Sequence, residues 1–171
     1  MSMSIFEVII TIITLFTLFG VVWALKEISE LKKEIAEKKT VSPNTLQLQL
    51  QAYERLSVLS ERIAIQNVLT RIPNSGLSSR EMQHALIDNI KTEYDYNVSQ
   101  QIYIQPEIWK AVDNLKEQNI YIINQLASTL PGNASAMDLS KQIVDFLINN
   151  PNFSLHKIVH EAINMEAKKL M

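Results

Sequence analysis

The sequence lacks the residues on which several common kinds of functional site depend. It has no cysteine among 171 residues, which excludes a disulfide framework and a thiolate metal site. Its three glycines, Gly20, Gly76 and Gly132, are too scattered to form a glycine-rich phosphate loop or a dinucleotide fingerprint. The net charge is −2 and the isoelectric point is near 5.9, with no basic stripe, so we expect no nucleic-acid partner.

A run of uncharged residues from Val8 to Leu25 is the most informative feature that the sequence does contain. As a helix it would be roughly 27 Å long, close to the thickness of the bilayer hydrocarbon. A cleaved signal peptide is one alternative, but Met1–Phe6 has no lysine or arginine and the run is too long. A buried core helix is another, although Lys26 follows directly. We expect residues 1–25 to be a transmembrane anchor, with residues 4–25 contacting the lipid bilayer.

The distribution of lysines around this run predicts its orientation. Only the α-amino group precedes the run, whereas five lysines follow it within fifteen residues: Lys26, Lys32, Lys33, Lys38 and Lys39. Because lysine and arginine are in excess on the cytoplasmic side of membrane segments, the N-terminus is expected outside and residues 26–171 in the cytoplasm.

Residues 26–42 form a charged connector that we expect to continue the helix as a stalk. Ile28, Leu31 and Ile35 are three and four residues apart and form a thin apolar seam. One interpretation is a short parallel coiled coil that makes a homodimer, and the other is a solvated stalk. The connector contains two heptads at most, which is too short a repeat to distinguish a coiled coil from a solvated stalk.

Prolines divide the remaining sequence into segments of helical length. Proline is unfavourable inside a helix, and the intervals of roughly 20 to 30 residues suit helices rather than strands. We therefore predict an all-α protein in which residues 43–171 form a bundle of about five helices. The prolines concerned are Pro43, Pro73, Pro106, Pro131 and Pro151.

Local signals refine the helix boundaries in this bundle. Ser78 and Glu81 have the spacing of a capping box, and Pro106 suits a first helical position. A break is expected between Ile63 and Val68, and Asn152 or Ser154 is expected to cap the last helix. Leucine and glutamine alternate in residues 46–51, as apolar and polar residues do in a strand, but this stretch is too short to outweigh the helical pattern around it.

Two histidine motifs are the candidates for metal chemistry. His156 and His160 lie four residues apart on one helix face and could bind zinc. However, Lys157 stands where a zincin has its glutamate, and Glu161 is rotated by about 100° from His160. Glu81 and His84 have the Glu-x-x-His spacing of di-iron bundle proteins, but the sequence has no second motif of this kind. We predict no catalytic residue, cofactor or metal; the alternative is a metal-dependent enzyme or metal-binding protein using His156 and His160.

An acidic and aromatic cluster is the candidate interaction surface, and it consists of Glu93, Tyr94, Tyr96, Tyr103 and Trp109. Tyrosine and tryptophan are favoured at protein interfaces because a polar edge accompanies a large apolar ring. The alternative is that the same residues fill the seams between helices of the bundle.

Two stretches of the soluble part, Leu50–Ile63 and Glu93–Tyr103, together with Trp109, carry a resemblance. Over residues 44–130 the chain resembles a family of uncharacterised single-pass membrane proteins from the Bacteroidetes group, which has no known activity. The resemblance implies a bacterial inner-membrane location. We therefore predict a non-enzymatic, membrane-anchored helical protein that presents a cytoplasmic interaction surface to a protein partner of unknown identity.

Overall fold

The computed structural model of the chain describes residues 5–39, 42–151 and 155–171; of these, the side chains of residues 5–13 and 35–39 are not described. The described residues form seven α-helices and one 3₁₀-helix, without a strand, so the all-α prediction is confirmed. The chain divides into two compact units, residues 1–43 and residues 44–171. The finer division at residues 25 and 42 stays a prediction.

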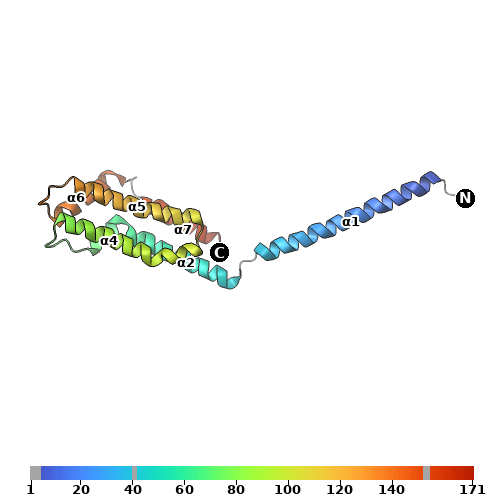
Figure 1. Cartoon of the computed structure of the whole chain (residues 1–171), viewed down its shortest axis with the longest axis horizontal. Helices are drawn as coiled ribbons and strands as arrows, with labels where there is room; N and C mark the ends of the chain where they lie inside the picture. Colours follow the sequence, from blue (N-terminus) through green and yellow to red (C-terminus); the bar gives the residue numbers. More distant parts are fainter. Residues whose placement is uncertain (1–4, 40–41, 152–154) are drawn as a thin grey trace. The chain divides into compact units, whose positions relative to one another are not determined.

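The first unit contains one long helix, α1 (Ile5–Lys39), which continues without a break from residue 5 of the predicted anchor to residue 39 of the predicted stalk (Figure 1). Its described side chains are all exposed. Among the described side chains, no helix carries an apolar stretch that meets the length and hydropathy of a membrane span. The side chains of residues 8–13, which are part of the predicted anchor, are not among those described. The large apolar side chains before Lys26 are 56% to 80% exposed: Leu15, Phe16, Leu18, Phe19, Val21, Val22, Trp23 and Leu25.

The second unit is a bundle of short helices (Figure 1). The described part contains six α-helices where about five were expected, because a break at Ala64 divides the first segment. Ala64 leaves the helical region at φ −57° and ψ 128°. In chain order the elements are α2 (Pro43–Ile63), α3 (Ile65–Arg71), α4 (Ser79–Asn97), η1 (Val98–Ile102), α5 (Pro106–Ser128), α6 (Ala136–Asn149) and α7 (Leu155–Lys168).

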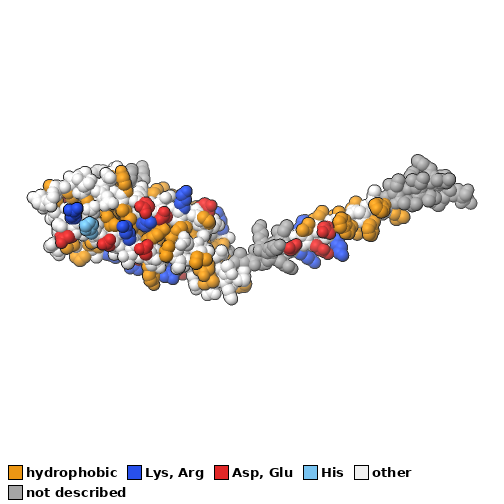
Figure 2. Space-filling view, in the orientation of Figure 1, with side chains coloured by type: hydrophobic (Ala, Val, Ile, Leu, Met, Phe, Trp, Pro, Cys, Tyr) orange, Lys and Arg blue, Asp and Glu red, His pale blue; other side chains and the backbone are white. Residues whose placement is uncertain are grey.

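The bundle is held together by one apolar core. Helix α4 packs against α3, α5 and α6, and α5 also packs against α6 and α7. Each helix contributes residues three or four apart, as a 3.6-residue period requires. Outside the core, apolar and charged side chains are mixed on the visible face of the bundle (Figure 2). The largest fully buried side chains are Leu56, Leu59, Ile63, Val68, Met82, Leu86, Ile90, Leu115, Ile123, Leu139, Ile143 and Ile163.

Two capping boxes begin α4 and α6. The predicted box is confirmed: Ser78 Oγ accepts from the Glu81 N–H at 3.2 Å, and the Glu81 carboxylate accepts from the Ser78 N–H at 2.8 Å. Ser135 and Asp138 form a second, unforeseen box with distances of 3.3 and 2.9 Å. Because backbone N–H groups stabilise the charged carboxylates, the pKa of Glu81 and that of Asp138 are lowered.

The two helix starts also exchange backbone hydrogen bonds. The Ser79 N–H donates to the Ala134 carbonyl and the Ala136 N–H donates to the Leu77 carbonyl, each at 2.9 Å. These bonds form an isolated antiparallel bridge between Ser78 and Ser135. Helices α4 and α6 therefore begin side by side.

The remaining boundary predictions have different outcomes. Pro106 is the first residue of α5, as predicted. Residues 46–51 lie within α2 and not in a strand. The proposed caps Asn152 and Ser154 lie outside the described residues.

Candidate functional site

The predicted interaction residues lie in two different places on the bundle. Glu93 and Tyr96 face α2, and Tyr94 faces α5, because successive helical residues are rotated by about 100°. Glu93 and Tyr96 line a surface groove of about 400 Å³ between α2 and α4, which we call the α2–α4 groove. Its lining residues are Gln51, Glu54, Arg55, Val58, Arg62, Glu93, Tyr96 and Asn97.

One end of the α2–α4 groove is held by an ion pair between the two helices and by a hydrogen bond within α4. Arg62 Nε lies 2.9 Å from Glu93 Oε1, and the Glu93 side chain is only 16% exposed. Asn97 is buried, and its Nδ2 donates to the Glu93 carbonyl at 2.9 Å. The partly buried carboxylate of Glu93 is thus paired, and this ion pair joins α2 and α4 at this end of the groove.

The other end of the groove presents an exposed cation and an exposed ring. The Arg55 guanidinium carbon lies 5.4 Å from the centre of the Tyr96 ring, a cation–π distance. Tyr96 is 73% exposed and the neighbouring Val58 is 52% exposed. Within the described part of the chain, Arg55 makes no ion pair with a carboxylate. The N–H donors of Arg55 are therefore open to solvent, beside the aromatic ring of Tyr96 and the aliphatic side chain of Val58.

Tyr94 and Trp109 instead pack in the seam between α4 and α5. Their ring centres are 5.2 Å apart and tilted by 40°, and Lys116 Nζ lies 4.1 Å from the Tyr94 ring centre. Lys116 in turn binds Asp113 at 2.8 Å and, by hydrogen bonding and charge, holds the pKa of Asp113 below its usual range. Tyr103 likewise packs partly buried against the core. These residues are mainly part of the bundle's packing.

Tyr94 gives this seam an expected pH dependence. Burial, and then hydrogen bonding to Asp113, raise the pKa of Tyr94 to about 12. An unfolded tyrosine titrates near pH 10, so between pH 10 and 12 the unfolded state loses its proton first and the fold loses stability. Relative to Tyr94→Phe, the wild type should lose about 1 to 2 kcal/mol over this interval. Urea unfolding followed by circular dichroism measures the difference.

Tyr121→Phe is the matched control, because Tyr121 lies on α5 and is 60% exposed. It should follow the wild-type pH profile. If Tyr94→Phe and the wild type lose stability in parallel from pH 10 to 12, the assignment of the loss to Tyr94 is wrong.

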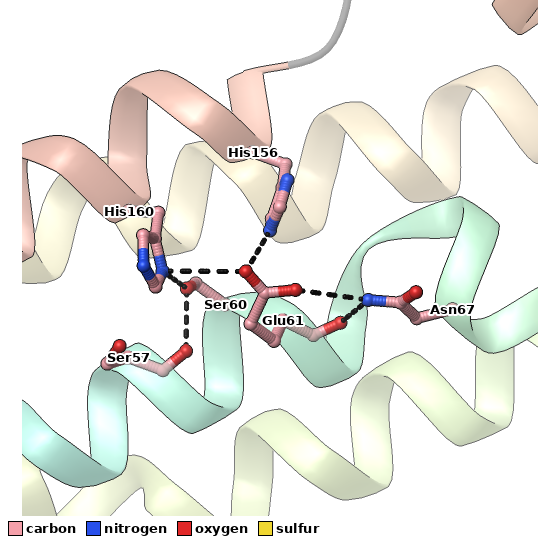
Figure 3. Close-up of polar contacts among 6 residues, drawn as sticks. All are labelled: Ser57, Ser60, Glu61, Asn67, His156 and His160. Carbon is pink, nitrogen blue, oxygen red and sulfur yellow. Dashed lines mark hydrogen bonds and ion pairs between the residues drawn. The ribbon is translucent and has the colours of Figure 1, made fainter.

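The two histidines meet an acid that is distant in sequence (Figure 3). Both side chains extend from α7 towards Glu61 on α2: His156 Nε2 lies 3.0 Å and His160 Nδ1 3.6 Å from Glu61 Oε1. The other side of the Glu61 carboxylate accepts from Asn67 Nδ2 at 3.2 Å. Ser60 Oγ lies 3.4 Å from His160 Nδ1. This cluster connects α2, α3 and α7.

The geometry of the cluster differs from that of a catalytic triad. A triad histidine uses one ring nitrogen for the serine and the other for the carboxylate. Here Ser60 and Glu61 both approach Nδ1 of His160, and Ser60 is fully buried and donates to the Ser57 carbonyl at 2.8 Å. Among the described side chains, no three His, Cys, Asp or Glu residues are placed to hold one metal ion. The arrangement supports helix packing.

Asn119 is a structural residue that sequence reasoning missed. It is buried on α5, where its Nδ2 donates to the Ile63 carbonyl at 2.8 Å. That carbonyl lies at the end of α2, where the break at Ala64 leaves it without a helical partner. The available signal was an asparagine between Leu115 and Ile122 on the apolar face of a helix.

A second hollow, between α3 and α6, is mostly apolar and has a volume of about 480 Å³. Val144 and Ile148 on its α6 wall are 43% and 71% exposed. Its complete lining is Gln66, Leu69, Thr70, Val144, Leu147, Ile148 and Pro151.

Together these features define a class of all-α protein, with a long N-terminal helix, a second unit of packed helices and an open groove on that unit. The chain belongs to the family of unknown function DUF7935, whose model matches residues 2–170. The predicted likeness to an uncharacterised family is confirmed at this level, whereas the Bacteroidetes origin and the single membrane passage stay predictions. No curated protein and no solved structure matches the chain.

Proposed function

We propose that the chain is a non-enzymatic, membrane-anchored module whose helical bundle captures a protein partner in the α2–α4 groove. The observation that carries this proposal is the exposed pair of Arg55 and Tyr96 beside the fixed ion pair of Arg62 and Glu93. Arginine and tyrosine are, with tryptophan, the residue types most enriched at interface hot spots.

The chemistry of the groove suits one kind of partner. Because the planar guanidinium of Arg55 lies over a ring and not against a carboxylate, its N–H donors remain available to a carboxylate of the partner. Val58 and the Tyr96 ring offer apolar area beside it. The partner would therefore be a protein segment that carries an acidic side chain next to an apolar one.

Two observations support the membrane anchor. The uncharged run of residues 8–25 precedes five lysines, and the apolar side chains of residues 15–25 are exposed on α1. Large exposed apolar surfaces mark contacts with a membrane or another protein. The proposed location is a bacterial inner membrane, with the N-terminus outside and the bundle in the cytoplasm.

The test is crosslinking of the full-length chain in its native membrane, followed by purification and mass spectrometry. Arg55→Ala and Tyr96→Ala should each lower the recovery of one specific protein by about tenfold, as expected for hot-spot residues. Arg80→Ala and Tyr121→Ala, which also alter exposed residues of the bundle, should leave the recovery unchanged. Equal recovery with all four variants would exclude the groove as the binding surface.

The anchor is tested on a separate sample of the same membranes, which is washed at alkaline pH and not crosslinked. The chain should stay with the membranes, because an inserted helix resists extraction. Its release into the wash would contradict the anchor without affecting the result for the groove.

A further inference from the structure

Helix α1 carries a continuous seam with a 3.5-residue period. Thr17, Val21, Ala24, Ile28 and Leu31 follow one another at steps of four, three, four and three residues. This alternation is the a and d pattern of a left-handed coiled coil, with Val21 and Ile28 at a and the others at d. In the structure, Val21, Ile28 and Leu31 are 50% to 56% exposed, so nothing in the described part of the chain covers the seam.

The composition of the seam fits a close helix pair. Gly20, at position g beside the seam, and Ala24, at position d, are small residues on the same side of the helix, which lets two helix backbones approach closely in an apolar segment. A Cβ atom added to Gly20 would meet nothing within 4 Å in the described part of this chain, so intramolecular packing does not require the glycine. Further along, Ile28 at a and Leu31 at d are the residue types that favour two parallel strands.

The charges beside the seam identify the partner helix as an identical one. Glu27 occupies position g and Lys32 occupies position e of the next heptad. In a parallel dimer, g of one helix faces the following e of the other, so each Glu27 would meet a Lys32 of the second copy, twice by symmetry. An antiparallel pair would instead bring e towards e and g towards g, which places like charges together.

We infer that α1 is a dimerisation helix, and that its seam is occupied in parallel by the α1 helix of a second copy of this chain. This interface adds to the proposed function and does not depend on it. A dimer carries two α2–α4 grooves, so a partner with two binding segments would gain from linked binding at both.

Introduced cysteines offer a direct test, because the chain has no cysteine of its own. Full-length chains carrying Ile28→Cys or Leu31→Cys should form disulfide-linked dimers under mild oxidation. Ser29→Cys and Lys33→Cys, at the outward positions b and f, are the matched controls and should give at least fivefold less dimer. Equal crosslinking at all four positions, or none at Ile28 and Leu31, would overturn the inference.

A charge exchange tests the parallel pairing in the Leu31→Cys chain. Glu27→Lys and Lys32→Glu should each lower the dimer yield about threefold, because each places like charges across the interface. The double variant restores opposite charges and should recover the yield. A double variant as weak as the single ones would contradict this register.

The crosslinking is read both in membranes and after solubilisation in mild detergent. Loss of membrane attachment would therefore leave the dimer visible, and failure of partner capture would not alter it. The dimer and the proposed function can thus fail separately.

Discussion

Leu86→Ala is expected to lower the free energy of unfolding of the bundle by about 2 to 5 kcal/mol. Leu86 lies at the centre of α4, is fully buried, and belongs to the face that packs against α5 and α6. Truncation removes buried methyl groups and leaves a cavity that rigid neighbouring helices fill only partly. A loss of this size is a large fraction of the stability of an ordinary domain.

Trp109 fluorescence during urea unfolding can measure this loss. The sequence has two tryptophans, Trp23 on α1 and Trp109 in the bundle, so Trp23→Phe in every chain isolates the bundle signal. Ile158→Ala is the matched control, because Ile158 is 61% exposed, and it should change the free energy by less than about 0.5 kcal/mol. Similar losses for Leu86→Ala and Ile158→Ala would show that Leu86 is not in a packed core.

Asn119→Ala is expected to cost about 1 to 3 kcal/mol of unfolding free energy in the same assay. The substitution removes the donor that reaches the Ile63 carbonyl at 2.8 Å and leaves that carbonyl buried without a partner. An unpaired buried carbonyl loses its hydration without compensation, so the cost exceeds that of an ordinary surface hydrogen bond.

Asn114→Ala provides the comparison, since Asn114 lies on the same helix but is exposed. Its substitution by alanine should be close to neutral, because alanine also has the higher helix propensity. If Asn119→Ala is equally neutral, water or another group must satisfy the Ile63 carbonyl.

The division of the chain into helices was largely predictable, because a proline limits a helix through its own backbone and needs no contact with distant residues. The Ser78–Glu81 box and the start at Pro106 are signals of the same kind, written in neighbouring residues. The break at Ala64 lies within the predicted interval from Ile63 to Val68, but no turn residue marks its position, since alanine is a good helix former and the turn is completed by Asn119 from α5. Tertiary contacts therefore decided where the first segment divides.

The candidate site was harder to foresee for a geometric reason. Glu93 and Tyr94 are adjacent in sequence, yet a helix rotates them apart, so Glu93 borders the α2–α4 groove and Tyr94 packs between α4 and α5. Likewise, the acid beside His156 and His160 is Glu61 from α2, not the neighbouring Glu161. Arg55, which completes the Tyr96 surface, also comes from α2. Such groupings depend on which helices pack together.

The bridge between the starts of α4 and α6 has a consequence for how this bundle moves. Two antiparallel backbone bonds, through Ser79 and Ala136, fix both the height and the rotation of one helix against the other. A displacement by one residue along either axis would break both bonds at once and move both capping boxes out of place. The starts of helices α4 and α6 are therefore held in one register, so we expect a sliding motion between these two helices to be resisted at this end of the bundle.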